Sequence, residues 1–397
     1  MSAVEWKELG SLCEIKGRIG FRGYTRDDQV EKGEGAISLS PANIVDSRLC
    51  YDDSTYISWS KYNESPEIMV FNDDLIFCKT ASVGKVSMVE NLPCEATINP
   101  QLVVLKNICV NSKYLYYCLC GNKVQDEVKA MAGVGSVPNV SQTKLANILI
   151  PIPSLAKQQE IVSHLDTFTT LISNLESELD MRRKQYEHYR NQLLDFEGVE
   201  GVEWKTLGEL SLKITDGAHS SPKSTNEGYY MPSVKDMTDN GFDFSDCKII
   251  SKEDYEVLKR IGCQPNLNDI LIAKDGSMLK YVFVVKEKLD IVVLSSIAII
   301  TPKIELVMPE YLVCYLKQSS FREIVIRDYS SKGGVPRIIL KNFRKIVIPI
   351  PSLSTQQEIV SKLDAFENLI QSLEQEIKLR KQQYEYYREK LLTFEKD

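Results

Sequence analysis

Three short stretches of the chain come near to catalytic motifs; two depart from their motif at an essential position, and the third is a grouping that arises by chance. A DNA methyltransferase needs Asn/Asp-Pro-Pro-aromatic, and Asn99–Leu102 (NPQL) lacks both the second proline and the aromatic ring. A P-loop needs G-x-x-x-x-G-K-[S/T], and Gly84–Lys85 has neither the first glycine nor the hydroxyl. Asp73–Asp74 with Lys79 resembles a nuclease cluster, but such groupings arise by chance where 26% of residues are charged. The sequence therefore predicts no catalytic site.

The cysteines and histidines do not form a metal-binding pattern. The chain has ten cysteines and three histidines, with irregular spacing and no C-x-x-C pair. Zinc sites need regularly spaced Cys and His ligands. We expect buried or half-buried thiols that stay reduced, and no metal or other cofactor bound by this chain.

Composition predicts a soluble protein of several domains. A chain of 397 residues is long enough for two or three globular units. It has no apolar run of membrane-spanning length, and its charged start does not resemble a signal peptide, so we expect a cytoplasmic protein. The net charge of -7 argues, taken alone, against a nucleic-acid partner.

The chain repeats itself at an offset of 198 residues. Residues 148–197 and 346–395 share about 31 identities in 50 aligned positions without a gap, and VEWK at 4–7 returns at 202–205. Because the end of one copy leads directly into the start of the next, the two chain ends occupy equivalent places. We expect them to lie near each other.

The matched parts are predicted to be long helices. After the motif PIPSL, apolar residues recur every three or four positions over about five heptads, from Ile161 to Phe196 and again from Ile359 to Phe394. A helix of about 38 residues is roughly 57 Å long. The economical partner for each apolar stripe is the other copy, packed antiparallel about a pseudo-two-fold axis. Arg182 and Arg380 fall in the seam, where we expect paired or snorkelling charges.

The unmatched parts, 10–145 and 208–343, are predicted to be α+β domains. DILIA, YVFVVKE and IAIITP have strand patterns, and PEYLVCYLKQSSFREIVIRD has a helix pattern. Traces of common ancestry survive, since NDDLIFCK at 72–79 resembles LNDILIAK at 267–274, and SVP at 136–138 matches GVP at 334–336. One fold has diverged into two surfaces.

The duplicated motif P-x-P-S-L-x-x-Q-Q-E-I-V, at 151–162 and 349–360, each time after a divergent domain, resembles the specificity subunits of type I restriction-modification enzymes. The resemblance spans the whole chain. It implies a subunit without catalysis of its own, which reads a bipartite asymmetric DNA site and holds methyltransferase subunits, with or without restriction and translocation subunits. S-adenosylmethionine would belong to the partner.

The repeat agrees with this resemblance. Two unlike domains joined by a rigid helical spacer can read two unlike half-sites at a fixed separation. The expected domains are a first target-recognition domain at 1–150, a spacer helix region at 151–201, a second target-recognition domain at 202–348 and a second spacer region at 349–397. Local basic loops could meet phosphates although the chain as a whole is acidic.

Polar loops that follow the matched tryptophans or end predicted strands are the candidate DNA contacts. Glycines in the loop 16–26 allow close backbone approach, and its arginines can pair with guanine or phosphate. The loop 215–223 is its counterpart. The candidates are Arg18, Arg22, Tyr24, Arg26, Lys79, Thr80, Ser82 and Lys85, and then Thr215, Asp216, His219, Ser221, Lys223, Lys274, Ser277 and Lys332.

Two other functions stay open. An enzyme combining recognition and catalysis is disfavoured by the missing motifs. A structural coiled-coil scaffold without DNA specificity is disfavoured because a scaffold does not need two variable domains that differ from each other.

Overall fold

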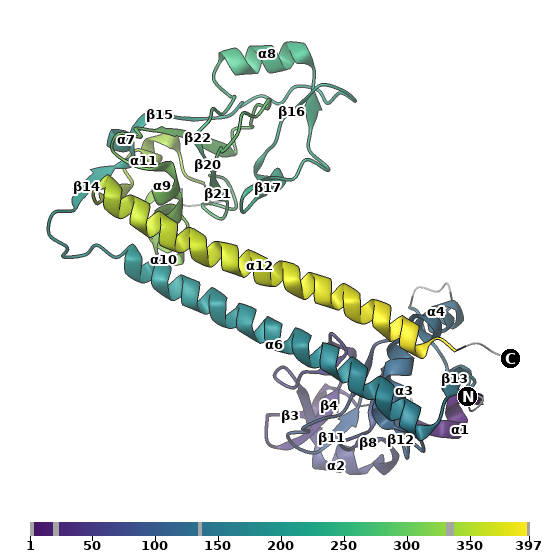
Figure 1. Cartoon of the computed structure of the whole chain (residues 1–397). Coiled ribbons are helices and arrows are strands. Elements are labelled where there is room, and N and C mark those ends of the chain that lie inside the picture. The colour runs from purple at the N-terminus through teal and green to yellow at the C-terminus, as the bar shows by residue number, and fades with distance from the viewer. Residues whose placement is uncertain (1–3, 19–23, 134–136, 331–336, 395–397) are drawn as a thin grey trace. The chain divides into compact units, whose positions relative to one another are not determined.

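The computed structural model describes residues 4–18, 24–133, 137–330 and 337–394, and the chain divides into two compact units (Figure 1). Unit 1 is Met1–Glu176 with Gln375–Asp397, and unit 2 is Ser177–Glu374. The boundary between the units passes through both long helices. Packing therefore groups each mixed domain with the helix segments that cover it, whereas the boundaries expected from the repeat separate domain from helix.

A two-stranded ribbon closes each domain where the chain enters and leaves it. In unit 1, β1 (Glu5–Glu8) pairs antiparallel with β13 (Leu149–Ile152), with Glu5 opposite Ile152. In unit 2, β14 (Glu203–Thr206) pairs with β23 (Val347–Ile350), with Glu203 opposite Ile350. Both registers agree with the 198-residue offset. Prolines are tolerated in these strands because each ribbon has free edges.

A four-stranded antiparallel sheet is common to both units. Its order is β10-β9-β12-β2 in unit 1 and β21-β20-β22-β15 in unit 2. The strands β9 and β20, which carry the related sequences NDDLIFCK and LNDILIAK, occupy the same place, so the predicted common ancestry is confirmed. The strands are β2 (Glu14–Lys16), β9 (Leu75–Cys78), β10 (Val86–Met88), β12 (Leu102–Lys106), β15 (Ser211–Asp216), β20 (Ile270–Ala273), β21 (Val282–Val284) and β22 (Ile297–Pro302).

Short helices cover this sheet in matching places. The buried Tyr114 of α3 and Tyr311 of α9 donate hydrogen bonds to the carbonyls of Pro151 and Pro349, at 2.7 and 2.9 Å. The helix predicted over PEYLVCYLKQSSFREIVIRD is in fact two, α9 and α10, because the chain breaks at 317–318. The helices are α1 (Leu9–Leu12), α3 (Ser112–Cys120), α4 (Asn122–Met131), α5 (Gln142–Ala146), α7 (Leu207–Leu210), α9 (Pro309–Leu316), α10 (Ser319–Tyr329) and α11 (Leu340–Phe343).

The units differ in what is added to this common sheet. Unit 1 adds a five-stranded sheet of order β3-β7-β4-β11-β8, a hairpin β5–β6 and α2, which share a core with one face of β9 and β12. Unit 2 adds the ribbons β16–β19 and β17–β18 with α8. The added elements are β3 (Gln29–Val30), β4 (Gly35–Leu39), β5 (Ile44–Val45), β6 (Arg48–Leu49), β7 (Thr55–Ser58), α2 (Trp59–Asn63), β8 (Met69–Val70), β11 (Ala96–Ile98), β16 (Tyr229–Tyr230), β17 (Met237–Thr238), β18 (Gly241–Phe242), β19 (Ile249–Ile250) and α8 (Lys252–Arg260).

The matched segments form the helices α6 (Leu155–Leu193) and α12 (Leu353–Leu392), with 39 and 40 residues. Each starts at the leucine that ends its PIPSL motif, one residue earlier than predicted. Gln158 and Gln356 explain the Gln-Gln motif, because each side chain is buried and ties its helix to the domain. Gln158 donates to the Pro153 carbonyl at 2.9 Å and accepts from the Asn111 N–H at 3.1 Å. Gln356 makes the matching bonds to Pro351 and Met308.

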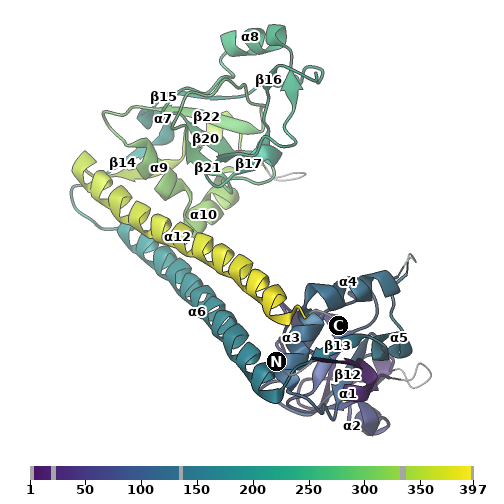
Figure 2. The same cartoon turned by 45° about the vertical axis from the view of Figure 1, so that its right-hand side comes forward.

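The two long helices pack antiparallel within each unit (Figure 1, Figure 2). In unit 1, Phe168 stacks on Tyr387 at 5.3 Å, and Glu176 pairs with Lys381 at 2.7 Å. In unit 2, Arg183 pairs with Glu374 at 2.6 Å, and Tyr189 stacks on Phe366 at 5.3 Å. Numbers rise along α6 as they fall along α12, so the predicted direction is confirmed. The seam arginines are paired as expected, Arg182 with Glu178 and Arg380 with Glu376, each at 3.3 Å.

Helix α4 links the segments next to the two chain ends. The ammonium of Lys123 lies 3.7 Å from the ring centroid of Trp6 in β1. The backbone N–H of Asn122 donates to the carboxylate of Glu389 in α12, at 3.1 Å. Residues near both ends therefore meet on one helix, in keeping with the duplication.

The cysteines form neither disulfides nor metal sites. All ten lie in the described ranges and are unpaired, and Cys50 and Cys109 are exposed, contrary to the expectation that every thiol would be at least half-buried. Within those ranges, no group of three or more potential ligands is placed to hold a metal ion. No helix that the structure describes combines the length and apolar composition of a membrane span.

Candidate nucleic-acid interface

In unit 2, candidates from two separate stretches meet where β15 and β20 end. Both strands flank β22, and Ala298 lies opposite Asp216 on one side and Ile272 on the other. Asp216 therefore comes beside Lys274, and a carboxylate oxygen of Asp216 lies 2.9 Å from the ammonium nitrogen of Lys274. The other carboxylate oxygen lies 3.3 Å from Nε2 of His219. We call this cluster the unit 2 strand edge.

The ion pair at this edge is almost enclosed. The side chains of Asp216 and Lys274 are 8% and 10% exposed, whereas that of His219 is 77% exposed. A buried charge needs a partner, and breaking such a pair leaves the other charge desolvated. Asp216 and Lys274 thus hold the loop that carries His219, which corrects the expectation that both would themselves face DNA.

The other candidates of unit 2 lie around this edge. The Lys248 ammonium donates to Ser221 and to the Pro222 carbonyl, which fixes part of the loop. Lys223 is exposed, and Thr215 and Ser277 are half-buried. Lys332 lies outside the described residues.

Unit 1 has the equivalent edge after β9. The carbonyl of Lys79 accepts from the Val140 N–H at 2.8 Å, as that of Lys274 accepts from Ile338 at 3.1 Å. Thr80 is half-buried and donates to the Asn139 side chain at 2.7 Å, and Ser82 is exposed. We call this the unit 1 strand edge.

Lys85 does not present its charge to a ligand as predicted. Its ammonium donates to the carbonyls of Pro41 and Ile44, at 3.2 and 3.0 Å, so it ties the start of β10 to the 3-10 helix Pro41–Asn43 and to the hairpin strand β5. The residue as a whole is exposed, so the two carbonyls hold its ammonium without burying the side chain.

The loop that starts at Lys16 is only partly as expected. Arg18 is 4% exposed and donates to the Ile98 carbonyl and the Thr97 hydroxyl, at 3.3 and 3.5 Å. Burial lowers the pKa of its guanidinium. Arg18 therefore anchors the loop, which corrects its predicted role. Tyr24 is half-buried and accepts from the Ser38 hydroxyl at 2.9 Å. Arg26, which opens the short 3-10 helix Arg26–Asp28, is exposed, and Arg22 lies outside the described residues.

Sequence reasoning missed two residues at these edges. Thr80 forms an isolated antiparallel bridge with Asn139, and Asp275 forms one with Arg337. Asn139 and Arg337 are both exposed. The available signal was the recurrence of Val-Pro directly before each of them, at 137–138 and 335–336.

The near-catalytic stretches have structural roles. Asp74 is almost buried and pairs with Lys106 at 2.9 Å, away from Lys79. Asn99 forms hydrogen bonds with Gln101 within its own turn.

Two buried cysteines of α3 are not activated thiols. Burial raises the pKa of the Cys118 and Cys120 thiols, to about 12 and about 11, which keeps them from acting as nucleophiles at neutral pH.

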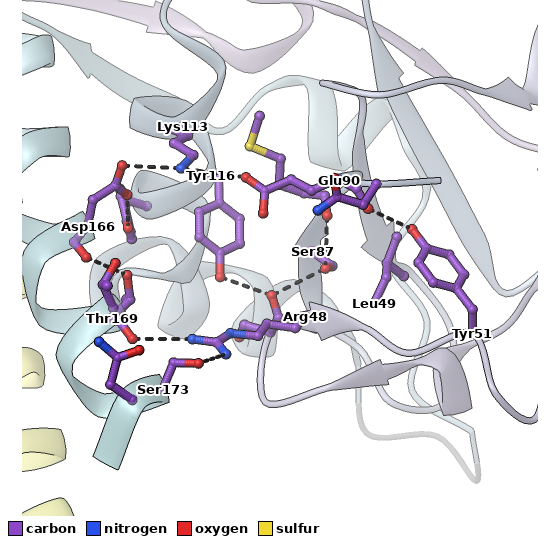
Figure 3. Close-up of a pocket in the computed structure, with 16 residues that line it drawn as sticks. Arg48, Leu49, Tyr51, Ser87, Glu90, Lys113, Tyr116, Asp166, Thr169 and Ser173 are labelled. Atoms are coloured by element: carbon purple, nitrogen blue, oxygen red, sulfur yellow. Dashed lines mark hydrogen bonds and ion pairs between the residues drawn. The ribbon is translucent and has the colours of Figure 1, made fainter. Parts of the chain in front are cut away.

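A polar cavity of about 560 Å³ lies in unit 1, between the β5–β6 hairpin, α3 and α6 (Figure 3). Arg48 reaches from the hairpin to the Ser173 hydroxyl and the Thr169 carbonyl, at 3.0 and 3.3 Å. Lys113 lies between Glu90 and Asp166, at 3.5 and 3.2 Å. These contacts connect the β5–β6 hairpin to α6 and the segment after β10 to α3.

Comparison with known proteins agrees with this architecture. A family model described as the type I restriction modification DNA specificity domain matches residues 1–181 and 200–379. The type I restriction enzyme EcoR124I/EcoR124II specificity subunit of Escherichia coli is 36% identical over 281 residues, which is 66% of this chain and 65% of that protein. The putative specificity subunit S.HindORF215P of Haemophilus influenzae is 30% identical over 298 residues, covering 72% and 73%.

A solved chain from a study of complex assembly and conformational transition in a type I R-M system has the same fold. Its TM-score is 0.63 at 16% identity, and the match covers 99% of this chain and 98% of that one. The family model spans most of the chain in two consecutive matches. The chain therefore belongs to the type I restriction modification DNA specificity family and carries the family's domain twice.

Proposed function

We propose that this chain is the non-catalytic DNA-recognition subunit of a type I restriction-modification complex. It reads a bipartite asymmetric target, one half-site per unit, and the helical pair sets the spacing between the half-sites. One observation carries the proposal. Both units keep the same four-stranded sheet, the same ribbon and the same buried glutamine at the start of the long helix, while the polar groups at the two strand edges differ. A duplicated framework with two unlike polar edges is suited to reading two unlike sequences.

The partners follow from this role. Double-stranded DNA is the ligand, and the methyltransferase subunits supply the S-adenosylmethionine site and the chemistry, with restriction and translocation subunits where the host has them. The subunit acts where its DNA lies, in the cytoplasm. An acidic chain can bind DNA through local basic groups, with further positive charge supplied by its partners.

The DNA-contacting set is narrower than the sequence suggested. We retain Tyr24, Arg26, Lys79, Thr80 and Ser82 in unit 1, and Thr215, His219, Ser221, Lys223 and Ser277 in unit 2. Arg18, Lys85, Asp216 and Lys274 are assigned to holding the loops. Arg22 and Lys332 remain candidates on sequence alone.

Exchange of the variable regions tests the proposal. The chain is co-expressed with the methyltransferase subunit of its own host, and methylated adenines are mapped across the genome. We expect a split motif, one half of which changes when residues 10–145 are exchanged with a relative and the other when 208–343 are exchanged. A folded complex without site-specific methylation would favour the coiled-coil scaffold instead.

The spacing role has its own test. Insertion of seven residues into α6 within 165–195, with a matching insertion in α12, lengthens the pair by about 10 Å. We expect the spacer of the motif to grow by about three base pairs while both halves stay intact. An active variant with unchanged spacing would refute the role of the helices in setting the distance.

A further inference from the structure

The two strand edges contain one structurally equivalent pair of residues each. Thr80 and Asp275 directly follow the lysines that come after β9 and β20. Each is bridged by a residue that follows a Val-Pro sequence, Asn139 or Arg337. In both units the next residue donates its N–H to the lysine carbonyl. The backbone thus places Thr80–Asn139 and Asp275–Arg337 in the same way, and only the side chains differ.

Residues opposite each other in an antiparallel bridge hold their side chains on one face, with Cβ atoms about 4.5–5.5 Å apart. In unit 1 this pair is neutral, since Thr80 donates to the Asn139 side-chain oxygen at 2.7 Å and so fixes the amide. Asn139 is exposed, and its NH₂ group and the second lone pair of its side-chain oxygen make no hydrogen bond to the described residues, so both can bind a ligand.

In unit 2 the pair is charged and incomplete. Arg337 is exposed, and no side-chain hydrogen bond or ion pair joins it to the described residues. One buried carboxylate oxygen of Asp275 has no hydrogen-bond partner in the described part of the chain. Buried acceptors are rarely left unsatisfied, so this oxygen lacks a donor that the described residues do not supply. Asp275 as a residue is half-buried, so part of its surface stays open to a ligand beside Arg337.

The base edges of DNA supply the complementary groups. In the major groove, arginine pairs bidentately with O6 and N7 of guanine, and a carboxylate accepts from N4 of cytosine. Asparagine pairs bidentately with N6 and N7 of adenine. The charged pair matches both members of one G·C pair, and the neutral pair matches adenine.

We propose that these equivalent pairs are specificity-determining: Asp275 and Arg337 read a G·C base pair in one half-site, and Asn139, oriented by Thr80, reads adenine in the other. This inference rests on the proposed function and adds the base recognised at one position of each half-site.

The test compares methylation rates of the complex of chain and methyltransferase subunit on duplexes that vary one base pair at a time. We expect Arg337→Gln to lose roughly 10- to 100-fold in rate on the target duplex, through loss of the preference at one G·C position. The other positions of that half-site and the whole of the other half-site keep their preferences. Asp275→Asn relaxes the same position.

The matched control is Arg327→Gln, which removes an exposed arginine of the same unit that pairs with Asp328 on α10. It leaves every position unchanged if the effect belongs to Arg337. A uniform loss on all duplexes with Arg337→Gln would show a phosphate contact and overturn the inference, as would an unchanged profile.

Unit 1 is tested by giving it the residue types of the unit 2 pair. We expect Asn139→Arg with Thr80→Asp to convert one position of its half-site from adenine to guanine. An adenine preference that survives in this variant would overturn the inference and leave the bipartite function standing. A wild-type complex without a split motif would overturn both.

Discussion

The place where α3 or α9 meets the long helix is built differently in the two units. In unit 1, Asp166 of α6 accepts from Tyr117 at 2.6 Å and pairs with Lys113 at 3.2 Å. Its repeat counterpart in unit 2 is Asp364 of α12, and Glu310 and Cys314 stand where the lysine and the tyrosine would be. Burial and the charges of Glu367 and Glu310 raise the pKa of Asp364, against the effect of Lys286.

The two units share some contacts and differ in others. We call the shared contacts the framework, and the contacts between each mixed domain and its long helix the joint. The glutamine clamps, the tyrosine-to-proline bonds and the ribbons recur with the same partners, because both copies must start a long helix in the same way. The polar contacts between each domain and its helix do not recur. A domain is therefore matched to its own helix, and simple exchange of one domain for the other would place Lys113 or Glu310 against the wrong neighbours.

The largest expected effect concerns the strand edges. Lys274→Met leaves the buried carboxylate of Asp216 without its ammonium partner, which costs about 3–5 kcal/mol of local stability. Lys79→Met, at the equivalent place in unit 1, costs about 0.5 kcal/mol or less, because Lys79 forms no ion pair among the described residues. Hydrogen exchange at the amides of β20 and β9 in the full-length chain measures both. An equal loss of local stability in the two variants would mean that the ion pair of Asp216 with Lys274 does not distinguish the two strand edges.

The glutamine clamps are expected to be alike. Gln158→Ala and Gln356→Ala each remove at least two hydrogen bonds and leave buried backbone groups unpaired, at a cost of about 2–3 kcal/mol. Urea unfolding of each variant, with Gln159→Ala as an exposed control, checks the match. A difference above about 1.5 kcal/mol between the two would show that the framework is not equivalent.

The smallest effects come from the two aspartates and have opposite signs. Asp166→Asn loses an ion pair and costs about 1 kcal/mol at pH 7. Asp364→Asn removes repulsion from Glu367 one turn away and gains about 0.5 kcal/mol. Thermal unfolding of both variants at pH 7 measures the signs, and destabilisation by Asp364→Asn would contradict the contrast between the joints.

The pH dependence sharpens this prediction. Because the folded-state pKa of Asp364 is raised, the folded protein holds that proton more tightly than the unfolded chain does. Wild type therefore recovers stability from this group as pH falls through the raised pKa, and the penalty returns as pH rises. The advantage of Asp364→Asn should shrink toward pH 4. An advantage that does not depend on pH would assign the gain to packing instead.

Sequence alone was sufficient for the repeat and for what depends on local periodicity. The seam from Ile161 to Phe196, the start of each helix after its prolines and the kinship of β9 with β20 follow from spacing and residue type, which act over a few positions. Tyr189 is exposed although it falls in the predicted seam, yet it still stacks on Phe366. The antiparallel direction followed from where the repeat begins and ends.

Only the tertiary structure decided where the long polar side chains go. Arg18 turns inward because the carbonyl of Ile98 on β11 accepts from it, and Lys274 is buried because β22 brings Asp216 beside it. The ammonium of Lys85 is held by the carbonyls of Pro41 and Ile44, about 40 positions earlier in the chain. Asn139 and Arg337 reach the strand edges through bridges to residues about 60 positions away. A flexible cationic side chain takes the acceptor that the fold provides, and no local pattern records which acceptor that is.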